Sequence, residues 1–584
     1  MIQVLSTNIT SPLGFTTEEN YRAVLSGKSA LKRYEGLWGL PEPFAASLFT
    51  EEQRAKLEIE GQTFFEALAI HSAREALSRI QLDVASPRVV LILSTTKGNI
   101  GESPAEAAKV IAKALGVSTT PIVVCNACVS GLSAQLLANN LLSAGLYDYA
   151  IVVGAEVQSK FIVSGFQSLK AVSEEPCRPF DIERIGLNPG EAAATIIFKT
   201  PSDFCPPSSK ALPNCSATNG QLPSMGRNKG SLALEGEVGR GSSWCLLDGA
   251  TCNDAYHNVS PSPQGEGLTS AIKAVMEGQD KSQLATVCAH GTATLYNDQM
   301  ESVAIQRAGL SDIPLSALKG YYGHTMGAAG VLETILTMRA TDDGIVLPTK
   351  GFTELGVSGK VSISSKPQKT EKRAFLKIMS GFGGSNVAAL YTKDPSMGRN
   401  KESLALEGEV WRGSSTRLSS KDGRSLTDIY KQEIGNYPKF YKMDILSRLA
   451  FVASELLIKE SSSLPSSSGE GSGKGALILF NHSSSIVADR QFLKTISDAE
   501  NFFPSPSVFT YTLPNITTGE IAIRNHFQGE TSFYILPEKD EALMRQILEA
   551  TLLGTGAKTV ISGWIDAESD TNFECELSIY IIHK

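Results

Sequence analysis

One cysteine of this chain stands where a nucleophile would be placed. Cys128 follows the apolar run Val123–Cys125 and precedes a helix-like pattern of leucines at positions 136, 137, 141 and 142. This order predicts a strand, a tight turn and a helix, with Cys128 where the helix begins. Because the N-terminal end of a helix is electropositive, a cysteine there is favoured as the thiolate and becomes a nucleophile. Taken alone, the segment fits an inert buried cysteine equally well.

Two histidines lie in segments that could complete a site around that cysteine. His290 lies in CAHGTAT (288–294), after an apolar stretch, and His324 lies in KGYYGHTMGAAG (319–330). A single histidine in a loop is more often structural than catalytic, but two in small-residue turns favour chemistry here. Cysteine holds an acyl group as a thioester, and neutral imidazole N–H groups stabilise negative charge on a carbonyl oxygen. The three side chains suit acyl transfer followed by carbanion chemistry.

A glycine-rich turn at 381–386 (GFGGSN) could add backbone N–H donors to an oxyanion hole. It follows an apolar run at 375–379 that is typical of a strand. The turn lacks the glycine spacing of a dinucleotide or P-loop fingerprint, so nucleotide binding is not indicated.

The elements that must position these residues alternate between strands and helices. A helix is expected at 65–77 and another after 262–268, and buried strands are expected at 88–93, 149–156, 190–198 and 375–379. Continuous apolar strands between helices indicate a sheet covered on both faces, as in a layered α/β fold.

The chain divides into two parts of unequal length. We expect a first domain at 1–392, with a disordered or exposed insertion at about 202–243 where Pro, Ser, Gly and Asn replace the periodic pattern. A linker at 393–415 and a second, smaller domain at 416–584 follow. The second domain repeats the order of helix, strand, loop, strand and helix seen at 65–150.

One internal repeat does not look like a fold unit. Residues 223–243 and 395–415 are identical at 19 of 21 positions. Structural repeats usually diverge and come in arrays of at least about three, so these copies look like duplicated coding sequence. We expect both copies to be exposed and to contribute little to stability; a paired binding motif is the functional alternative.

Composition limits the partners and the compartment. The 584 residues are 42% hydrophobic and 20% charged, with a formal net charge of −8. That charge argues against nucleic acid or an anionic membrane as the main partner, although an acidic carrier protein could dock on a local basic patch. Nine cysteines make no disulfide framework in a chain of this length. Without a signal-peptide pattern or an apolar run of about 20 residues, we expect a cytoplasmic protein with free thiols.

Five motifs together resemble those of β-ketoacyl-(acyl carrier protein) synthases, the decarboxylating condensing enzymes of the thiolase fold. They come in the family's order, and the match covers essentially all of 1–392 apart from the insertion. They are NACVSG at 126–131, RPFD at 178–181, AHGTATLYND at 289–298, KGYYGHTMGAAGVLE at 319–333 and SGFGGSN at 380–386. The resemblance implies a thiolase-like fold with α-β-α-β-α layers.

The resemblance also implies a role for each reactive residue. Cys128 would be the acylated nucleophile. His290 and His324 would activate the decarboxylation of a malonyl thioester and stabilise the resulting enolate. Lys319 would assist them as a further catalytic residue, and Glu333 would support that lysine.

Phe382 would be the mobile gate of the site, and its backbone N–H would join that of Cys128 in the oxyanion hole, with Gly383 supporting the same turn. No metal or organic cofactor is implied, because phosphopantetheine arrives on the acyl carrier protein. The implied partners are that carrier, acyl and malonyl thioesters, and a second copy or a related ketosynthase-like subunit in a dimer.

Departures from the common family pattern are few. Asn126 and Ser385 stand where Thr is usual, and Ala293 stands where Gly is usual. None removes a reactive group, so they bear on substrate preference rather than on activity. With Tyr321–Tyr322 and Asn297–Asp298, the set is similar to synthases of aryl-polyene or flexirubin-type pigment clusters.

The second domain resembles the N-terminal half of the same fold, in the form of small ketosynthase-like proteins. Aligning Gly519 with Gly131 places Ile516 where the nucleophile should be. An aliphatic side chain forms no thioester, so we expect a non-catalytic module that packs on, or pairs with, a condensing enzyme. A folded appendage with only a stabilising role is the alternative.

Three other functions fit parts of the sequence. Cys125 and Cys128 have the spacing of a thioredoxin-like redox motif, but that function leaves both histidine motifs unexplained. An inactive partner such as a chain-length factor would lack the nucleophile, whereas Cys128 is present. A thiolase would condense without decarboxylation and use a second catalytic cysteine, and the context of His324 favours the decarboxylating type.

Overall fold

The structure is a computed structural model that describes residues 1–201, 244–400, 409–461, 475–498, 500–555, 557 and 559–583. We call its residues up to 392 the first unit and its residues from 409 onward the second unit. The strands of the first unit are β1 (Ile2–Thr10), β2 (Lys32–Tyr34), β3 (Phe44–Ala46), β4 (Val89–Ser94), β5 (Ile122–Val124), β6 (Tyr149–Glu156), β7 (Ala192–Lys199), β8 (Cys245–Asn253), β9 (Leu284–Cys288), β10 (Pro314–Ser316), β11 (Ile345–Val346), β12 (Ser362–Ile363), β13 (Gln368–Lys369), β14 (Ala374–Gly381) and β15 (Ser385–Thr392). Those of the second unit are β16 (Glu409–Ser419), β17 (Ala476–Asn481), β18 (Thr531–Ile535), β19 (Thr559–Ser569) and β20 (Asn572–His583).

The α-helices connect these strands. In the first unit they are α1 (Thr17–Leu25), α2 (Glu51–Leu57), α3 (Phe64–Leu77), α4 (Pro104–Leu115), α5 (Ser130–Ser143), α6 (Lys160–Ser168), α7 (Glu266–Met276), α8 (Leu295–Arg307), α9 (Lys319–Tyr322) and α10 (Ala329–Asp342). In the second unit they are α11 (Leu426–Glu433), α12 (Ile445–Glu460), α13 (Ile486–Lys494), α14 (Pro506–Tyr511), α15 (Ile516–Asn525) and α16 (Glu541–Thr555).

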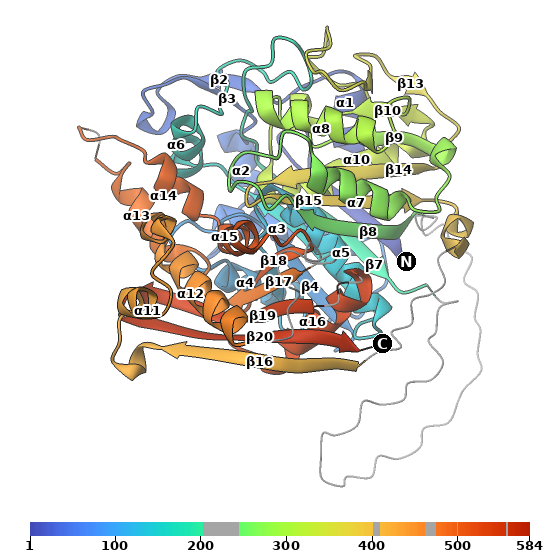
Figure 1. Ribbon diagram of the computed structural model, residues 1–584. Coiled ribbons are helices and arrows are strands. Elements are labelled where there is room, and N and C mark those ends of the chain that lie inside the picture. The colour runs from blue at the N-terminus through green and yellow to red at the C-terminus, as the bar shows by residue number, and fades with distance from the viewer. Residues whose placement is uncertain are drawn as a thin grey trace.

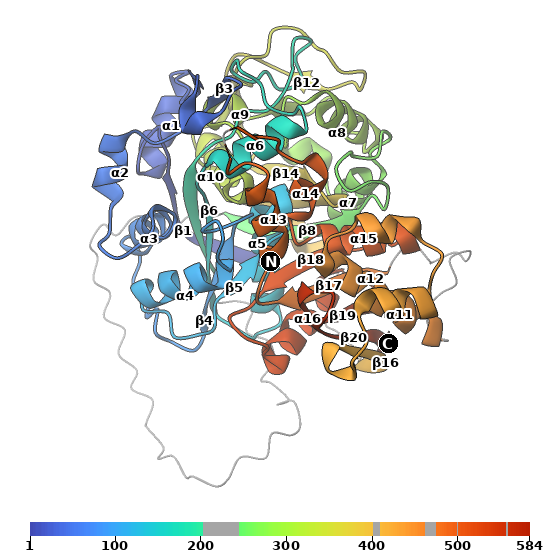
Figure 2. The same ribbon diagram turned by 90° about the vertical axis from the view of Figure 1, so that its left-hand side faces the viewer.

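Helices and strands form five alternating layers in the first unit. Helices α5 and α10 lie in the middle, because α5 contacts both β6 and β15 while α10 contacts both β7 and β14. Helix α3 packs on the outer side of β6 and β7, and α7 packs on the outer side of β8 and β15 (Figures 1 and 2). The expected thiolase-like arrangement of α-β-α-β-α layers is confirmed.

The apolar runs form these layers because successive side chains of a strand point to opposite faces of the sheet. In β4, Val90 and Ile92 join the core around α5 and α10, whereas Val89 and Leu91 join the core under α3 and α4. Each face needs an apolar side chain, so the strand is a continuous apolar run with no polar alternation.

Sixteen strands of the described residues join in one sheet that spans both units. Their order is β12-β10-β9-β14-β15-β8-β1-β7-β6-β4-β5-β18-β17-β19-β20-β16. The units meet at β5 and β18, which pair antiparallel with Val124 opposite Tyr534 and Val123 opposite Ile535. Pairing across this junction gives each edge strand the backbone partners that it would otherwise lack.

The second unit repeats the strand order of the first unit outward from this junction. The order β5-β4-β6-β7-β1 corresponds to β18-β17-β19-β20-β16, with the same parallel and antiparallel pairings. Helix α16 contacts α5 across the junction. The expected likeness of the second unit to the N-terminal half of the fold is therefore confirmed.

The same correspondence corrects the alignment that placed Ile516 at the nucleophile position. Cys128 lies between β5 and α5, and the corresponding connection, between β18 and α16, is Leu536–Asp540. Ile516 instead begins α15, which precedes β18 as α4 precedes β5. The alignment was wrong because it matched single glycines. The corrected segment, Leu-Pro-Glu-Lys-Asp, also contains no cysteine.

Most predicted elements are found at or near their predicted bounds. The helix predicted at 65–77 is α3, and the strand predicted at 149–156 is β6. Residues 409–415, expected in a linker, belong instead to β16, where Val410 pairs with Ile582 and Trp411 remains 57% exposed. The insertion at 202–243, with the first repeat copy, and part of the second copy, 401–408, lie outside the described residues.

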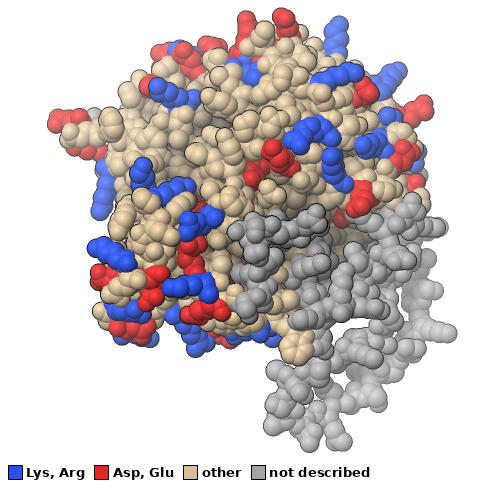
Figure 3. Space-filling model, in the orientation of Figure 1, with Lys and Arg blue, Asp and Glu red and all other residues tan. Residues whose placement is uncertain are grey.

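No helix among the described residues has the length and the apolar character needed to span a membrane. On the face drawn in Figure 3, outside the grey atoms, Lys and Arg are interspersed with Asp and Glu. The described cysteines are all free thiols.

Candidate active site

Cys128 is placed by the connection between β5 and α5. A short 3-10 turn spans Ala127–Val129, and α5 begins two residues after the cysteine at Ser130. The predicted order of strand, turn and helix is confirmed, with the cysteine in the turn rather than at the first helical residue. Ala127 has a positive φ of 48°, an unusual conformation for a residue with a side chain, so the backbone bends sharply just before the cysteine.

Glycines bring the segment of Cys128 against the segment of His324. A Cβ on Gly131 would lie 2.7 Å from the carbonyl oxygen of Gly327. A Cβ on Gly330 would lie 2.4 Å from the backbone nitrogen of Leu132, which no real side chain tolerates. The tight packing predicted for these small-residue turns is confirmed, and it places the starts of α5 and α10 side by side.

The structure brings the three predicted reactive side chains into one buried group. The Sγ of Cys128 and one ring nitrogen from each of His290 and His324 all lie within 4.8 Å of one another. The two imidazole rings meet edge to face with centroids 5.0 Å apart. Both histidines are 1% exposed and Cys128 is 8% exposed. Such a set could also hold a soft metal ion, but its packing around a thiol equally suits acyl chemistry.

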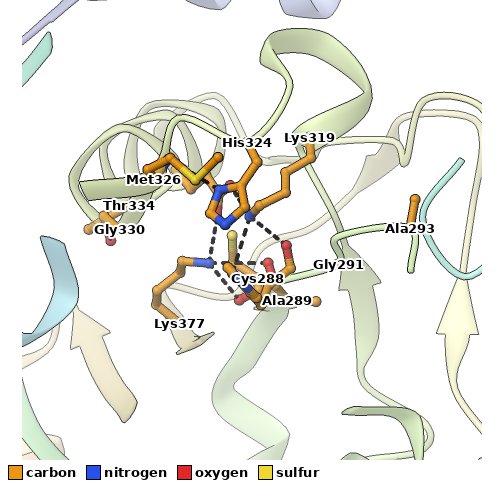
Figure 4. A network of polar contacts seen from close by, with 12 residues as sticks. Cys288, Ala289, Gly291, Ala293, Lys319, His324, Met326, Gly330, Thr334 and Lys377 are labelled. Carbon is orange, nitrogen blue, oxygen red and sulfur yellow. Dashed lines mark hydrogen bonds and ion pairs between the residues drawn. The ribbon is translucent and has the colours of Figure 1, made fainter. Parts of the chain in front are cut away.

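A buried polar network supports His290 from behind. The Lys319 ammonium donates to Nδ1 of His290 at 3.2 Å, to the His290 carbonyl at 2.6 Å, and to Glu333 at 2.7 Å. Lys377 of β14 donates to the other oxygen of Glu333 at 2.7 Å and to the carbonyl of Ala289 at 3.1 Å. Figure 4 shows Lys319 beside the His324 ring and Lys377 below it, with their ammonium ends pointing toward the same region. The network fixes the strand end that carries His290.

These contacts set the charge of the network. Burial opposes ionisation of Glu333, but Lys319 and Lys377 outweigh it and hold the pKa of that carboxyl below its ordinary value. Burial also opposes the charge of Lys377, yet its pKa lies above the ordinary value beside Cys288 and Glu333. One buried carboxylate thus pairs with two ammonium groups.

Both imidazoles are neutral, with Nε2 carrying the proton. Burial lowers the pKa of His290 and of His324 well below 6.5, and the positive charge of Lys319 lowers both further. Nδ1 of His290 accepts from Lys319, and Nδ1 of His324 accepts from the backbone N–H of Met326 at 3.2 Å. The proton of each ring therefore lies on Nε2. The Nε2 of His324 is buried with no hydrogen-bond partner among the described residues, so this donor is available for a substrate.

Cys128 is protonated at rest, whereas its position just before a helix predicts a thiolate. Burial raises its pKa to about 12, and the positive charge of Lys319 offsets only part of that rise. The helix dipole is worth at most about 2 kcal/mol, which burial in an apolar cavity exceeds. At neutral pH the resting side chain is a thiol, and it loses its proton as it reacts.

The glycine-rich turn lies over the cysteine. A Cβ on Gly381 would lie 3.5 Å from the backbone nitrogen of Cys128, so this end of β14 passes close to that N–H. Phe382 packs in the same apolar cluster as Cys128. Gly383 has a φ of +84°, which suits glycine, and its N–H donates to the carbonyl of Asn258 at 2.6 Å. The predicted gate residue therefore lies beside the predicted nucleophile.

Sequence reasoning missed several residues around this site. Lys377 is a single charge within the apolar strand Ala374–Gly381, and that isolation is the signal that could have revealed it. Glu301 accepts hydrogen bonds from the N–H groups of His290 and Gly291, the latter at 2.8 Å, and burial raises its pKa to about 7. Nothing in its helix α8 sets Glu301 apart in sequence.

The second unit contributes to the cavity beside Cys128. The cavity has a volume of about 10 Å³ and is lined by Thr96, Lys97, Ala127, Cys128, Ile162, Phe166, Met326, Phe382, Phe509, Thr512 and Leu513. Phe509, Thr512 and Leu513 belong to the second unit. No local sequence pattern indicates that residues almost 400 positions apart share this wall.

Two family models match the first unit. The model described as "Beta-ketoacyl synthase, N-terminal domain" matches residues 85–203, and the one described as "Beta-ketoacyl synthase, C-terminal domain" matches residues 245–353. The first match contains Cys128, and the second contains His290, Lys319, His324 and Glu333.

Curated relatives carry names of the same kind. The 3-oxoacyl-(acyl-carrier-protein) synthase 2 of Mycobacterium leprae (strain TN) is 30% identical over 284 residues, which span 47% of this chain and 60% of the relative's length. The protein of the same name from Vibrio cholerae serotype O1 is 26% identical over 441 residues, which span 67% of this chain and 99% of that protein.

A solved structure resembles the whole chain, including the second unit. The structure titled "PfaC Keto synthase-Chain length factor" matches 99% of this chain and 78% of its own, with a TM-score of 0.73 and 13% identity. At that identity the match shows a shared fold and no more.

Proposed function

We propose that the chain is a member of the β-ketoacyl synthase family and catalyses a decarboxylative Claisen condensation, as the two family models that match its first unit support. It would join an acyl group held on Cys128 to the two-carbon unit of a malonyl thioester on acyl carrier protein. The observation that carries this proposal is the buried group in which the Cys128 sulfur lies within 4.8 Å of both imidazoles. The reaction belongs to fatty acid or polyketide synthesis, and the aryl-polyene type fits the motif variants.

In the first step, the Cys128 sulfur attacks the carbonyl carbon of an acyl thioester on the carrier. The new S–C bond forms as the bond to the carrier's phosphopantetheine sulfur breaks, and the proton of the cysteine passes to that departing sulfur. Backbone N–H groups of Cys128 and Phe382 would stabilise the oxyanion. This role is supported by the packing of Gly381 against the backbone nitrogen of Cys128.

In the second step, the malonyl thioester loses CO₂ and becomes an enolate. The Nε2–H groups of His290 and His324 would donate to its thioester oxygen, where the negative charge develops. Their neutral state is compatible with this role, because each neutral ring accepts at Nδ1 and keeps the Nε2–H that donates. Lys319 and Glu333 would hold His290 in this tautomer.

In the third step, the enolate carbon attacks the acyl carbon on Cys128. A C–C bond forms, the C–S bond to Cys128 breaks, and the released thiolate takes up a proton from solvent. The products are a 3-oxoacyl thioester two carbons longer, CO₂ and the free thiol. This cycle uses the chain's own groups and carrier-bound phosphopantetheine, and it calls for no metal or organic cofactor.

The second unit would act as a non-catalytic partner joined to the first. The pairing of β18 with β5 supports this role, because the second unit thereby covers a strand edge that a separate subunit of the same fold could cover. The segment Leu536–Asp540, at the place of the nucleophile turn, offers no thiol. We place the acyl carrier protein as the substrate-bearing partner and the cytoplasm as the compartment, which the free thiols support.

Intact-protein mass spectrometry after incubation with acyl carrier proteins tests the proposed function. The wild-type chain should gain the mass of one acyl group, and Cys128→Ala should gain none, whereas Cys125→Ala should still gain it. Cys128→Gln should raise the rate of CO₂ release from malonyl carrier protein relative to the rate of condensation. If Cys128→Ala were acylated like the wild type, the mechanism would be wrong.

A further inference from the structure

Resting on the proposed function, we infer that Lys377 is a positioning residue for the decarboxylation of the malonyl thioester and takes no part in the acylation of Cys128. Its ammonium binds the strand end that carries His290 to Glu333, so that the imidazole presents its Nε2–H to the substrate. None of the five motifs that resemble the condensing enzymes contains this lysine.

The pairing of β9 with β14 ends just before His290. The last paired residue of β9 is Cys288, which lies opposite Lys377. Ala289 still donates its N–H to the carbonyl of Ser316 in β10 at 2.8 Å, but its own carbonyl lies beyond the ladder with β14. A buried carbonyl without a donor is costly, so the backbone from Ala289 onward needs partners other than strands.

Two buried ammonium groups supply these partners. Lys377 donates to the carbonyl of Ala289 at 3.1 Å, and Lys319 donates to the carbonyl of His290 at 2.6 Å. Both lysines are at most 1% exposed. Two consecutive carbonyls thus depend on two different lysines, and the position of His290 depends on both.

The Lys377 ammonium is surrounded by four oxygen atoms. They belong to Glu333 at 2.7 Å and to the carbonyls of Ala289 at 3.1 Å, Ile378 at 3.2 Å and Cys288 at 3.4 Å. Figure 4 shows the side chain pointing toward Cys288 and Ala289. An ammonium has three N–H donors, so these four oxygens, which we call the oxygen cage, hold it in one place.

Glu333 connects the oxygen cage to the imidazole. One of its oxygens accepts from Lys377 and the other from Lys319, each at 2.7 Å. Lys319 in turn donates to Nδ1 of His290 at 3.2 Å, which leaves the proton on Nε2. Burial and Lys319 are the main causes that lower the pKa of His290, and the charge of Lys377 adds to them. Without Lys377, Glu333 and the carbonyl of Ala289 would both lose a donor, and the ring would shift.

The turn that carries Cys128 is held by contacts of its own. The N–H of Val129 donates to the carbonyl of Asn126 at 3.2 Å, and the N–H of Asn126 donates to the hydroxyl of Ser130 at 2.8 Å. The four oxygen partners of Lys377 lie outside this turn. Loss of the ammonium should therefore impair the histidine and spare the nucleophile.

The test compares two half-reactions in the full chain carrying Lys377→Ala. Intact-protein mass spectrometry follows the acylation of Cys128 by acyl carrier protein, and the conversion of malonyl to acetyl carrier protein measures decarboxylation. The variant should be acylated as fast as the wild type. Its kcat for decarboxylation should fall about tenfold to a hundredfold, as it does when a catalytic group is misplaced by about 1 Å. Its KM for malonyl carrier protein should stay the same.

The variant should fold, because Glu333 and Lys319 remain as a pair of opposite charges. Lys369→Ala, which changes an exposed lysine of β13, serves as the control and should alter neither half-reaction.

Added cations distinguish positioning from a merely structural role. Methylammonium can occupy the oxygen cage that Lys377→Ala leaves and should restore part of the decarboxylation. Tetramethylammonium at the same concentration carries no N–H donor and should restore none. Lys377→Met fills the cage with an uncharged chain of similar length, so it should show the same loss without rescue, and it provides the test if Lys377→Ala fails to fold.

Unchanged decarboxylation in both variants, or an equal loss of acylation and decarboxylation, would overturn the inference alone. Equal rescue of Lys377→Ala by the two cations would do the same. A wild-type chain that is neither acylated nor able to decarboxylate malonyl carrier protein would instead refute the proposed function.

Discussion

The side-chain amide of Asn515 in the second unit donates a hydrogen bond of 2.8 Å to the backbone carbonyl of Phe382 in the first unit. The same asparagine lies against Gly383, where a Cβ would come within 2.7 Å of its amide nitrogen. The second unit thus touches the backbone of the turn at Phe382, the proposed gate, as well as the wall of the cavity. A second contact reaches the same turn. The Asn258 side-chain amide donates to Glu520 of the second unit, and the Asn258 carbonyl accepts from the Gly383 N–H.

Replacing Asn515 with alanine should loosen the proposed gate at Phe382. The change removes one hydrogen bond from Phe382, worth about 1 kcal/mol, and that energy corresponds to a factor of about 5 in an equilibrium between closed and open states. Alkylation of Cys128 by iodoacetamide, followed by peptide mass spectrometry, should therefore be about fivefold faster. Asn525→Ala, at the other end of α15, serves as the control and should not change the rate. Equal rates for the two variants would mean that Asn515 does not hold the gate.

Replacing Glu333 with glutamine should destabilise the fold strongly. The amide leaves Lys319 and Lys377 buried without a countercharge, and breaking a buried pair in this way costs about 3–5 kcal/mol. Urea unfolding measures the loss of unfolding free energy. Glu18→Gln removes a 42% exposed carboxylate that pairs at the surface with Arg22 and Arg339, and it should cost less than about 1 kcal/mol. Similar losses in both variants would contradict the stabilising role of the network.

Sequence patterns predicted the layers and the reactive groups of the first unit because each depends on a short segment. The run Ala150–Ala155 is apolar throughout, so β6 could be bounded in advance. The partner of Phe382 in the second unit could not be predicted, since it depends on the pairing of β5 with β18, and nothing local in Val123 or Tyr534 specifies that pairing. The misplacement of Ile516 has the same cause, because only the strand order shows which turn corresponds to which.

The neutral histidines predict how stability depends on pH. In the unfolded chain, His324 takes up a proton near its ordinary pKa of 6.5, whereas burial keeps it neutral in the fold to well below that value. As pH falls below 6.5, the unfolded state binds more protons, so the wild type loses stability. His324→Asn removes this contribution while its side-chain oxygen can still accept from Met326. Urea unfolding at pH 5.5 and at pH 7.5 measures how much less stable His324→Asn is than the wild type. This difference in unfolding free energy should be smaller at pH 5.5 than at pH 7.5. A deficit that is equal at both pH values would show that His324 titrates normally.

The buried thiol predicts how the reactivity of Cys128 depends on pH. Since burial raises its pKa to about 12, the fraction of thiolate should increase about tenfold for each unit of pH throughout the range from 7 to 9. The rate of iodoacetamide modification at Cys128, measured on its own peptide, should rise in proportion without reaching a plateau. Free cysteine offers the comparison, because its rate levels off above its ordinary pKa. If the modification rate of Cys128 levelled off below pH 8, the electropositive start of α5 would outweigh burial. The resting side chain would then be the thiolate that the sequence alone predicts.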